Sequence, residues 1–122
     1  MIHRDAEKSI KNLLRGNLFE TFIIPELVKS KLNRGEKPSF FFWRDSNGNE
    51  VDLIIEQGTK LMPVETKSGR TLTRESFSGL EKWLALAGKQ AAAPTLIYGG
   101  DDSYRQKEIK VVGWKDCGKL LK

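Results

Sequence analysis

The stretch covering residues 49–68 constrains the fold more than any other part of the chain, because it has the pattern of a β-hairpin. Its two arms, residues 51–56 and 61–67, are rich in apolar and β-branched side chains. Gly58 and Thr59 between them suit a two-residue turn whose first central residue has a positive φ. The sequence therefore predicts two antiparallel strands joined by a tight turn.

The turn also predicts which residues face one another across the hairpin. Counting back from a facing pair of Gln57 and Lys60 gives two further opposed pairs, Asp52 with Glu65 and Glu50 with Lys67. Because side chains alternate between the faces of a strand, these last four residues are expected to share one face. The other face is expected to join the core through its apolar residues, which are Val51, Leu53, Ile55, Met62 and Val64.

The acidic pair on the polar face suggests a metal site. Directly opposed Cβ atoms in an antiparallel sheet lie roughly 4.5–5.5 Å apart, so Asp52 and Glu65 would repel each other and lose hydration. A cation between them relieves both penalties, and oxygen ligands favour Mg²⁺ or Mn²⁺, which complete their shell with water and phosphate oxygens. Lys67 could then orient an attacking water or offset charge that develops in the transition state. A solvated surface hairpin is the alternative that the residues alone leave open.

Asp52, the hairpin and Glu65-Thr66-Lys67 resemble the D…(D/E)-X-K signature of the PD-(D/E)XK nuclease superfamily. More narrowly, four short motifs in this order along the chain resemble the nuclease-like domain of unknown function that follows the ATPase domain in many bacterial and archaeal AAA-type ATPases: residues 16–20, 42–45, 49–52 and 64–69. The resemblance covers residues 16–114. It implies an α/β, three-layer, restriction-endonuclease-like fold, in which a central mixed β-sheet is flanked by helices.

The resemblance also implies roles for individual residues. Glu20, Asp52 and Glu65 would bind Mg²⁺ or Mn²⁺, and Asp52, Glu65 and Lys67 would be the catalytic residues. The implied function is a metal-dependent nuclease that hydrolyses phosphodiester bonds of nucleic acid, with DNA as the expected substrate. The alternative is a catalytically inactive module of nuclease fold that docks the ATPase to nucleic acid or to a protein partner.

The composition agrees with a single domain over residues 1–122, with an N-terminal helical extension (1–15) and a basic C-terminal segment (115–122). A net charge of +5 and a pI near 9.4 favour a polyanionic partner. The single cysteine, Cys117, excludes an intrachain disulfide and suits the cytoplasm, which is reducing. No segment approaches the roughly 20 apolar residues of a membrane span, so no membrane association is expected.

Several classes of chemistry lack support in the sequence. His3 is the only histidine and lies outside every motif, so Ser-His or Cys-His catalysis and a His-ligated zinc site are not supported. There is no Walker A motif, so ATPase activity of this chain itself is not supported. The resemblance implies an ATPase domain elsewhere in the same natural polypeptide. The sequence leaves open whether the chain forms a homo-oligomer.

The remaining elements are expected on both sides of the hairpin. A helix is predicted from residue 17 to about residue 33, with Glu20 in its apolar stripe and with Pro25 kinking it or marking a boundary. The aromatic run in residues 39–44 predicts a first strand that is buried on both sides or lies beside the site. Its rings are expected to pack in the core, with base stacking as the alternative.

After the hairpin, a helix is predicted over residues 73–87, with Gly88 as its stop. Arg70 and Arg74 are candidate contacts to nucleic-acid phosphates, with solvated surface charges as the alternative. Residues 95–98 predict a buried strand, Asp101 and Asp102 a solvated turn, and residues 109–114 a closing strand at the edge of the sheet.

Overall fold

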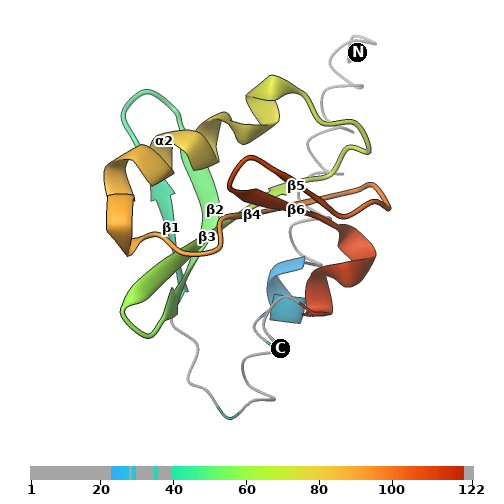
Figure 1. Ribbon diagram of the computed structural model, residues 1–122, viewed down its shortest axis with the longest axis horizontal. Helices are drawn as coiled ribbons and strands as arrows, with labels where there is room; N and C mark the ends of the chain where they lie inside the picture. The colour runs from blue at the N-terminus through green and yellow to red at the C-terminus, as the bar shows by residue number, and fades with distance from the viewer. Residues whose placement is uncertain (1–22, 28, 30–34, 36–39, 120–122) are drawn as a thin grey trace, which may run out of the picture.

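The computed structural model describes residues 23–27, 29, 35 and 40–119. Within them lies a mixed sheet of six strands in the order β1-β2-β3-β4-β6-β5 (Figure 1). The strands are β1 (Phe40–Arg44), β2 (Glu50–Gln57), β3 (Lys60–Lys67), β4 (Thr95–Tyr98), β5 (Tyr104–Gln106) and β6 (Ile109–Gly113). The first three strands are antiparallel, β4 and β6 run parallel to β3, and β5 is antiparallel to β6. The predicted α/β class and mixed sheet are thus confirmed.

One main helix, α2 (Ser78–Ala87), follows the hairpin and leads back to β4. A 3₁₀ turn, η1 (Arg74–Phe77), precedes it, and η2 (Gly88–Gln90) and η3 (Trp114–Lys119) follow later. The predicted helix is therefore present, although its first turn is 3₁₀. Phe77, Leu80 and Trp83 recur at intervals of one turn and are buried, and the helix ends at Gly88, which has φ +56°.

Two apolar clusters cover the two faces of the sheet. On one face, buried residues of η1 and α2 pack on side chains of β2, β4 and β6, and the cluster contains Val51, Ile54, Phe77, Leu80, Trp83, Leu96, Tyr98, Ile109 and Val111. On the other face, residues 23–27 and η3 come together, as Figure 1 shows, and that cluster contains Ile23, Leu27, Leu53, Ile55, Met62, Val64, Ile97, Val112 and Cys117. The strands β2, β3, β4 and β6 thus contribute the buried side chains, and the outer strands β1 and β5 lie at the edges.

The hairpin has the predicted register near its turn, where Gln57 pairs with Lys60 and the paired positions continue to Leu53 and Val64. The predicted pairs of Asp52 with Glu65 and of Glu50 with Lys67 lie beyond the end of this ladder; Glu50 pairs with Arg44 of β1 and Lys67 with Tyr98 of β4. The face predicted for Val51 is wrong, because Val51 belongs to the cluster under α2, whereas Leu53 belongs to the opposite one. The reason is a bulge: the register between β1 and β2 shifts between Phe41 and Trp43, so that β2 has one extra residue there.

Two expectations about strand position are wrong. The aromatic strand β1 lies at the edge of the sheet, and its Phe42 side chain is 70 % exposed and not in the core. The strand at residues 109–114, found as β6, is interior, because the short β5 pairs along its outer side. β5 consists of exposed residues without apolar alternation, so no hydrophobic pattern predicts it.

The remaining predictions concern the N-terminal part of the chain and a membrane-spanning helix. Glu20, the extension over residues 1–15 and most of the predicted first helix lie outside the described residues. Pro25 lies within the helical residues 23–27. No helix among the described residues is long and apolar enough to cross a membrane.

Candidate active site

The β2–β3 hairpin opens into a fork at the end away from its turn. The ladder between the two strands runs from the turn to the pair of Leu53 and Val64. Beyond this point β3 stays paired with β4 as far as Lys67, whereas the start of β2 stays paired with β1 as far as Glu50. The polar residues of the hairpin therefore stand where the two strands separate.

Asp52 lies in this fork and binds the facing strand through its side chain. Its Oδ2 atom accepts hydrogen bonds from the backbone N–H of Thr66 at 2.9 Å and from the Thr66 hydroxyl at 2.7 Å. A backbone N–H that loses its partner in a ladder needs another acceptor. The Asp52 carboxylate supplies it, and this fixes the carboxylate beside β3.

Glu65 is the buried carboxyl group of the site. It is 4 % exposed and faces α2, where its Oε2 atom would lie 3.2 Å from a Cβ atom placed on Gly79. Burial, followed by the hydrogen bond and the negative charge of Asp52, raises the pKa of Glu65 to about 9, although Lys67 partly opposes this shift. At neutral pH the Glu65 carboxyl group of the metal-free protein therefore holds a proton, and this proton occupies the place between two carboxylates that a cation could take.

A small hollow of about 150 Å³ opens beside Glu65. Its walls come from the turn before β2, from the end of β3 and from the start of the α2 segment; the lining residues are Gly48, Asn49, Glu50, Glu65, Lys67, Glu75, Ser78 and Gly79. Lys67 is exposed there, as a group that contacts a substrate must be. Glu50 is held by Arg44, whose guanidinium lies 3.0 Å from its carboxylate.

Gly79 determines how closely α2 approaches this hollow. A Cβ atom at Gly79 would lie 2.3 Å from the backbone oxygen of Glu50, which is far below any normal contact. Only glycine therefore lets the first turn of α2 cross directly over the start of β2 and cover Glu65. Glu75 and Gly79 are not among the predicted site residues. The small pair Ser78–Gly79 inside a predicted helix is the one signal in the sequence of a close backbone approach.

The fold brings together some of the predicted site residues. Asp52 and Glu65 interact directly, and Lys67 shares the hollow with Glu65. Arg70 lies 3.0 Å from Asp101 in an exposed ion pair, and Arg74 is exposed at the start of η1.

A family model with the description "Domain of unknown function (DUF4143)" matches residues 15–117. The chain belongs to the DUF4143 family. The matched range contains all six strands, α2 and every predicted site residue of this DUF4143 domain. No curated protein matches the sequence.

Asp52 and Glu65 of the DUF4143 domain have the donor atoms that a hard divalent cation prefers. Both groups supply oxygen atoms, and Mg²⁺ is commonly bound by one or two carboxylates together with water. Burial and the Asp52 carboxylate together raise the pKa of Glu65, and the positive charge of a cation placed between the two groups would favour its ionised form. In the described part of the chain, no three acidic, His or Cys side chains are grouped closely enough to hold an ion, so the pair would depend on water or on Glu20 for further ligands.

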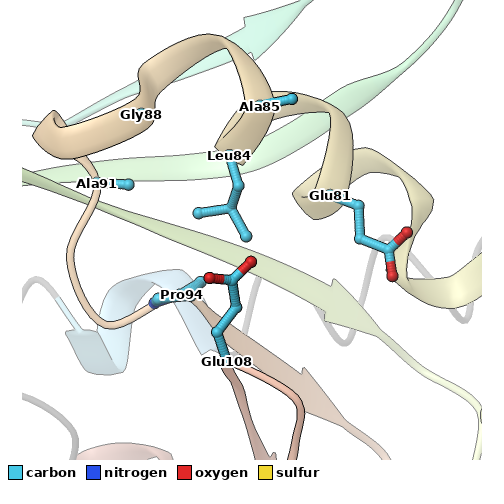
Figure 2. Close-up of a pocket in the computed structure, with 7 residues that line it drawn as sticks. All are labelled: Glu81, Leu84, Ala85, Gly88, Ala91, Pro94 and Glu108. Atoms are coloured by element: carbon cyan, nitrogen blue, oxygen red, sulfur yellow. The ribbon is translucent and has the colours of Figure 1, made fainter.

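A second hollow of the DUF4143 domain, of about 420 Å³, holds none of these residues (Figure 2). Its lining combines an apolar base with two exposed carboxylates, and consists of Glu81, Leu84, Ala85, Gly88, Ala91, Pro94 and Glu108. It lies beside the start of β4, at the end of the sheet opposite to Lys67. It offers no buried titratable group, and it is not a candidate for catalysis.

Proposed function

We propose that this DUF4143 domain is a metal-dependent nuclease of the PD-(D/E)XK type that hydrolyses phosphodiester bonds of nucleic acid. The single observation that carries the proposal is the buried Glu65 carboxyl group, held against Asp52 at the open end of the hairpin with Lys67 beside it. Strongly perturbed carboxyl groups in a hollow are typical of functional sites. The order of elements, an antiparallel hairpin followed by a helix and a parallel strand, is compatible with the restriction-endonuclease-like fold.

Each residue has a role in this proposal. Asp52 and Glu65 would hold a Mg²⁺ or Mn²⁺ ion, and Glu20 would add a third carboxylate. When bound, the ion would lower the pKa of a coordinated water and polarise the phosphate. Glu65 would release its proton when the ion binds, and Thr66 would keep Asp52 in place through its two hydrogen bonds.

Lys67 would act on the reacting groups themselves. Its ammonium group would orient the attacking water and stabilise negative charge on the phosphate in the transition state. DNA is the proposed substrate, and an ATPase domain of the same polypeptide is the proposed partner that delivers it. The net charge of +5 supports a polyanionic substrate.

The experiment compares the wild type with Lys67→Ala on labelled linear, nicked and branched DNA and on RNA, in Mn²⁺ or in EDTA. We expect cleavage of at least one substrate only with metal. Removal of a positioned charged group should lower the rate by about 10²–10⁴-fold while substrate binding changes little. Equal cleavage by both proteins, or cleavage that persists in EDTA, would contradict the proposal.

One observation favours a second function, a catalytically inactive module that docks an ATPase to nucleic acid or to a protein. Within the described residues the acidic pair lacks a third acidic ligand close enough to share an ion. This alternative predicts no metal-dependent cleavage by the 122-residue chain or by the chain joined to its ATPase domain with ATP present. The same cleavage assay therefore separates the two functions.

A further inference from the structure

The hollow of about 420 Å³ beside α2 has the size of a ligand pocket (Figure 2). Such pockets have volumes of roughly 300–1,000 Å³ and are lined mainly by apolar groups. Apolar groups from two segments line this hollow: Leu84 and Ala85 from α2, and Ala91 and Pro94 from the segment that leads to β4. A ligand with an apolar body therefore finds both space and apolar contacts there.

The segment that leads to β4 is fixed in place by backbone hydrogen bonds. The Ala92 N–H donates to the Leu61 oxygen of β3 at 2.9 Å. The Lys110 N–H of β6 donates to the Pro94 oxygen at 2.9 Å. Between these two bonds, Ala93 has φ +46°, a left-handed conformation that is uncommon for a residue with a Cβ atom. The wall of the hollow is thus preformed, so a ligand does not have to order it.

Two exposed carboxylates line the same hollow and come from different elements. Glu81 belongs to α2, and Glu108 lies at the turn between β5 and β6. Figure 2 shows the Glu108 carboxylate directed toward the Leu84 side chain. Neither carboxylate has an ion pair or a hydrogen bond with another residue that the structure describes. The lining contains no lysine or arginine, so the hollow is negative although the chain has a net charge of +5.

We propose that this hollow binds an aliphatic amine with an ammonium group at each end, such as an alkyl diamine or a polyamine. The methylene chain lies on the apolar groups, and each ammonium group pairs with one of the two carboxylates. Charge complementarity selects this ligand, because the carboxylates repel a nucleic acid or an acidic peptide. A lysine side chain of a partner protein brings one ammonium group and leaves one carboxylate unpaired.

This inference goes beyond the nuclease proposal and does not rest on it. The hollow lies beside the start of β4, at the end of the sheet opposite to Lys67. An amine bound there contacts none of the proposed catalytic residues. Neither nucleic acid nor catalysis enters the experiment, so its outcome leaves the nuclease proposal unchanged.

The test records ¹H–¹⁵N NMR spectra of the 122-residue chain during titration with hexane-1,6-diamine at constant ionic strength. We expect a Kd in the millimolar range, since the ligand is small and both ion pairs are exposed. The backbone amide signals of Gly88, Ala91 and Glu108 should shift. Those of Thr66 and Lys67, at the candidate active site, should stay in place.

Three related probes separate the contribution of charge from that of apolar contact. Hexan-1-amine should bind about 1.4- to 5-fold more weakly than the diamine, because it lacks one exposed ion pair. Propane-1,3-diamine keeps both charges but has three fewer methylene groups, and each buried methylene group contributes up to about 4-fold in affinity, so it should also bind more weakly. Hexan-1-ol, which has no charge, should bind more weakly than hexan-1-amine.

Two variants test the carboxylates one at a time. Glu81→Gln and Glu108→Gln should each weaken diamine binding by about 1.4- to 5-fold and should remove its advantage over hexan-1-amine. Asp102→Asn is the matched control, because it removes an exposed carboxylate from the loop after β4, at the other end of that strand. It should bind the diamine as the wild type does, and unchanged amide signals outside the hollow verify that each variant is folded.

Three results would overturn the inference. The first is equal binding of hexan-1-amine and the diamine, since one cationic side chain of a partner protein would then suffice. The second is wild-type binding by both glutamine variants. The third is a set of shifted signals around Glu65 in place of the hollow, or no shifted signals at all.

Discussion

The two ends of the β2–β3 hairpin have the same two strands but opposite chemistry. Near the turn, each residue from Leu53 to Gln57 has a ladder partner, and apolar side chains are buried on both faces of the sheet. At the open end, the ladder stops and a side chain, Asp52, takes over as the acceptor for the Thr66 N–H. The candidate site therefore lies where the backbone pairing between β2 and β3 ends.

The open end also depends on a neighbour that the closed end does not need. α2 covers Glu65 because Gly79 lets the helix approach the backbone of β2. The turn end is specified by the hairpin itself through Gly58, which has φ +62° and open space around it. Substitutions at the open end of the hairpin should therefore change three properties: the pH dependence of stability, the packing of α2 on β2, and stabilisation by a metal ion.

The largest expected effect is a loss of stability at alkaline pH that originates at Glu65. The folded protein binds the Glu65 proton more tightly than the unfolded chain, so this contribution is complete below about pH 4.5 and is lost as the pH rises toward about 9. Each pKa unit corresponds to about 1.4 kcal/mol, so the free energy of unfolding should fall by several kcal/mol. Urea titrations at pH 5, 7 and 9 in EDTA measure it.

Glu65→Gln should remove most of this pH dependence and should be more stable than the wild type at pH 9. Glu81→Gln, a change at an exposed position of α2, should keep the wild-type profile. If the free energies of unfolding of the wild type and of Glu65→Gln change with pH in parallel, Glu65 is already ionised at neutral pH.

The second effect concerns the contact between α2 and the start of β2. Gly79→Ala places a Cβ atom against the Glu50 backbone oxygen and should destabilise the protein by about 1–3 kcal/mol, because overpacking forces the helix away. Gly69→Ala is the control, since its Cβ atom would meet its nearest neighbour at an ordinary 3.8 Å. If chemical denaturation gives both variants the same stability, α2 does not depend on the close approach.

The smallest effect is stabilisation by metal. Mg²⁺ at ten times its Kd should raise the free energy of unfolding by about 1.4 kcal/mol, because it binds only the folded state. Asp52→Asn should abolish most of this rise, while Asp101→Asn, in an exposed ion pair with Arg70, should keep it. Calorimetry with and without Mg²⁺ provides the measurement, and an equal rise in all three proteins would place the ion elsewhere.

The local parts of the fold could be predicted from the sequence. Gly58–Thr59 and the alternation of the arms determine the register, which the structure confirms. The helix over residues 73–87 follows from apolar residues at helical spacing together with Gly88 as its stop. Both signals lie within one element and its turn, so no knowledge of distant strands is needed.

The remaining features depend on neighbours that are distant in sequence. The bulge that moves Val51 to the other face results from pairing with β1, which no count along the hairpin can reveal. Phe42 is exposed because β1 lies at the sheet edge, and strand order is not encoded in the strand itself. Glu75 enters the hollow only because α2 returns over the sheet.

The hairpin that carries Asp52 and Glu65 is local in sequence, whereas β4 joins β3 only after the chain has passed through η1, α2 and η2. Contacts that close short loops form more readily during folding than contacts that close long ones. We therefore expect the two carboxylates to meet while both are still hydrated, before α2 packs over Glu65. Proton uptake would then accompany the docking of α2, so alkaline solution would slow this later step, visible in the fluorescence of Trp83, and leave hairpin formation unchanged.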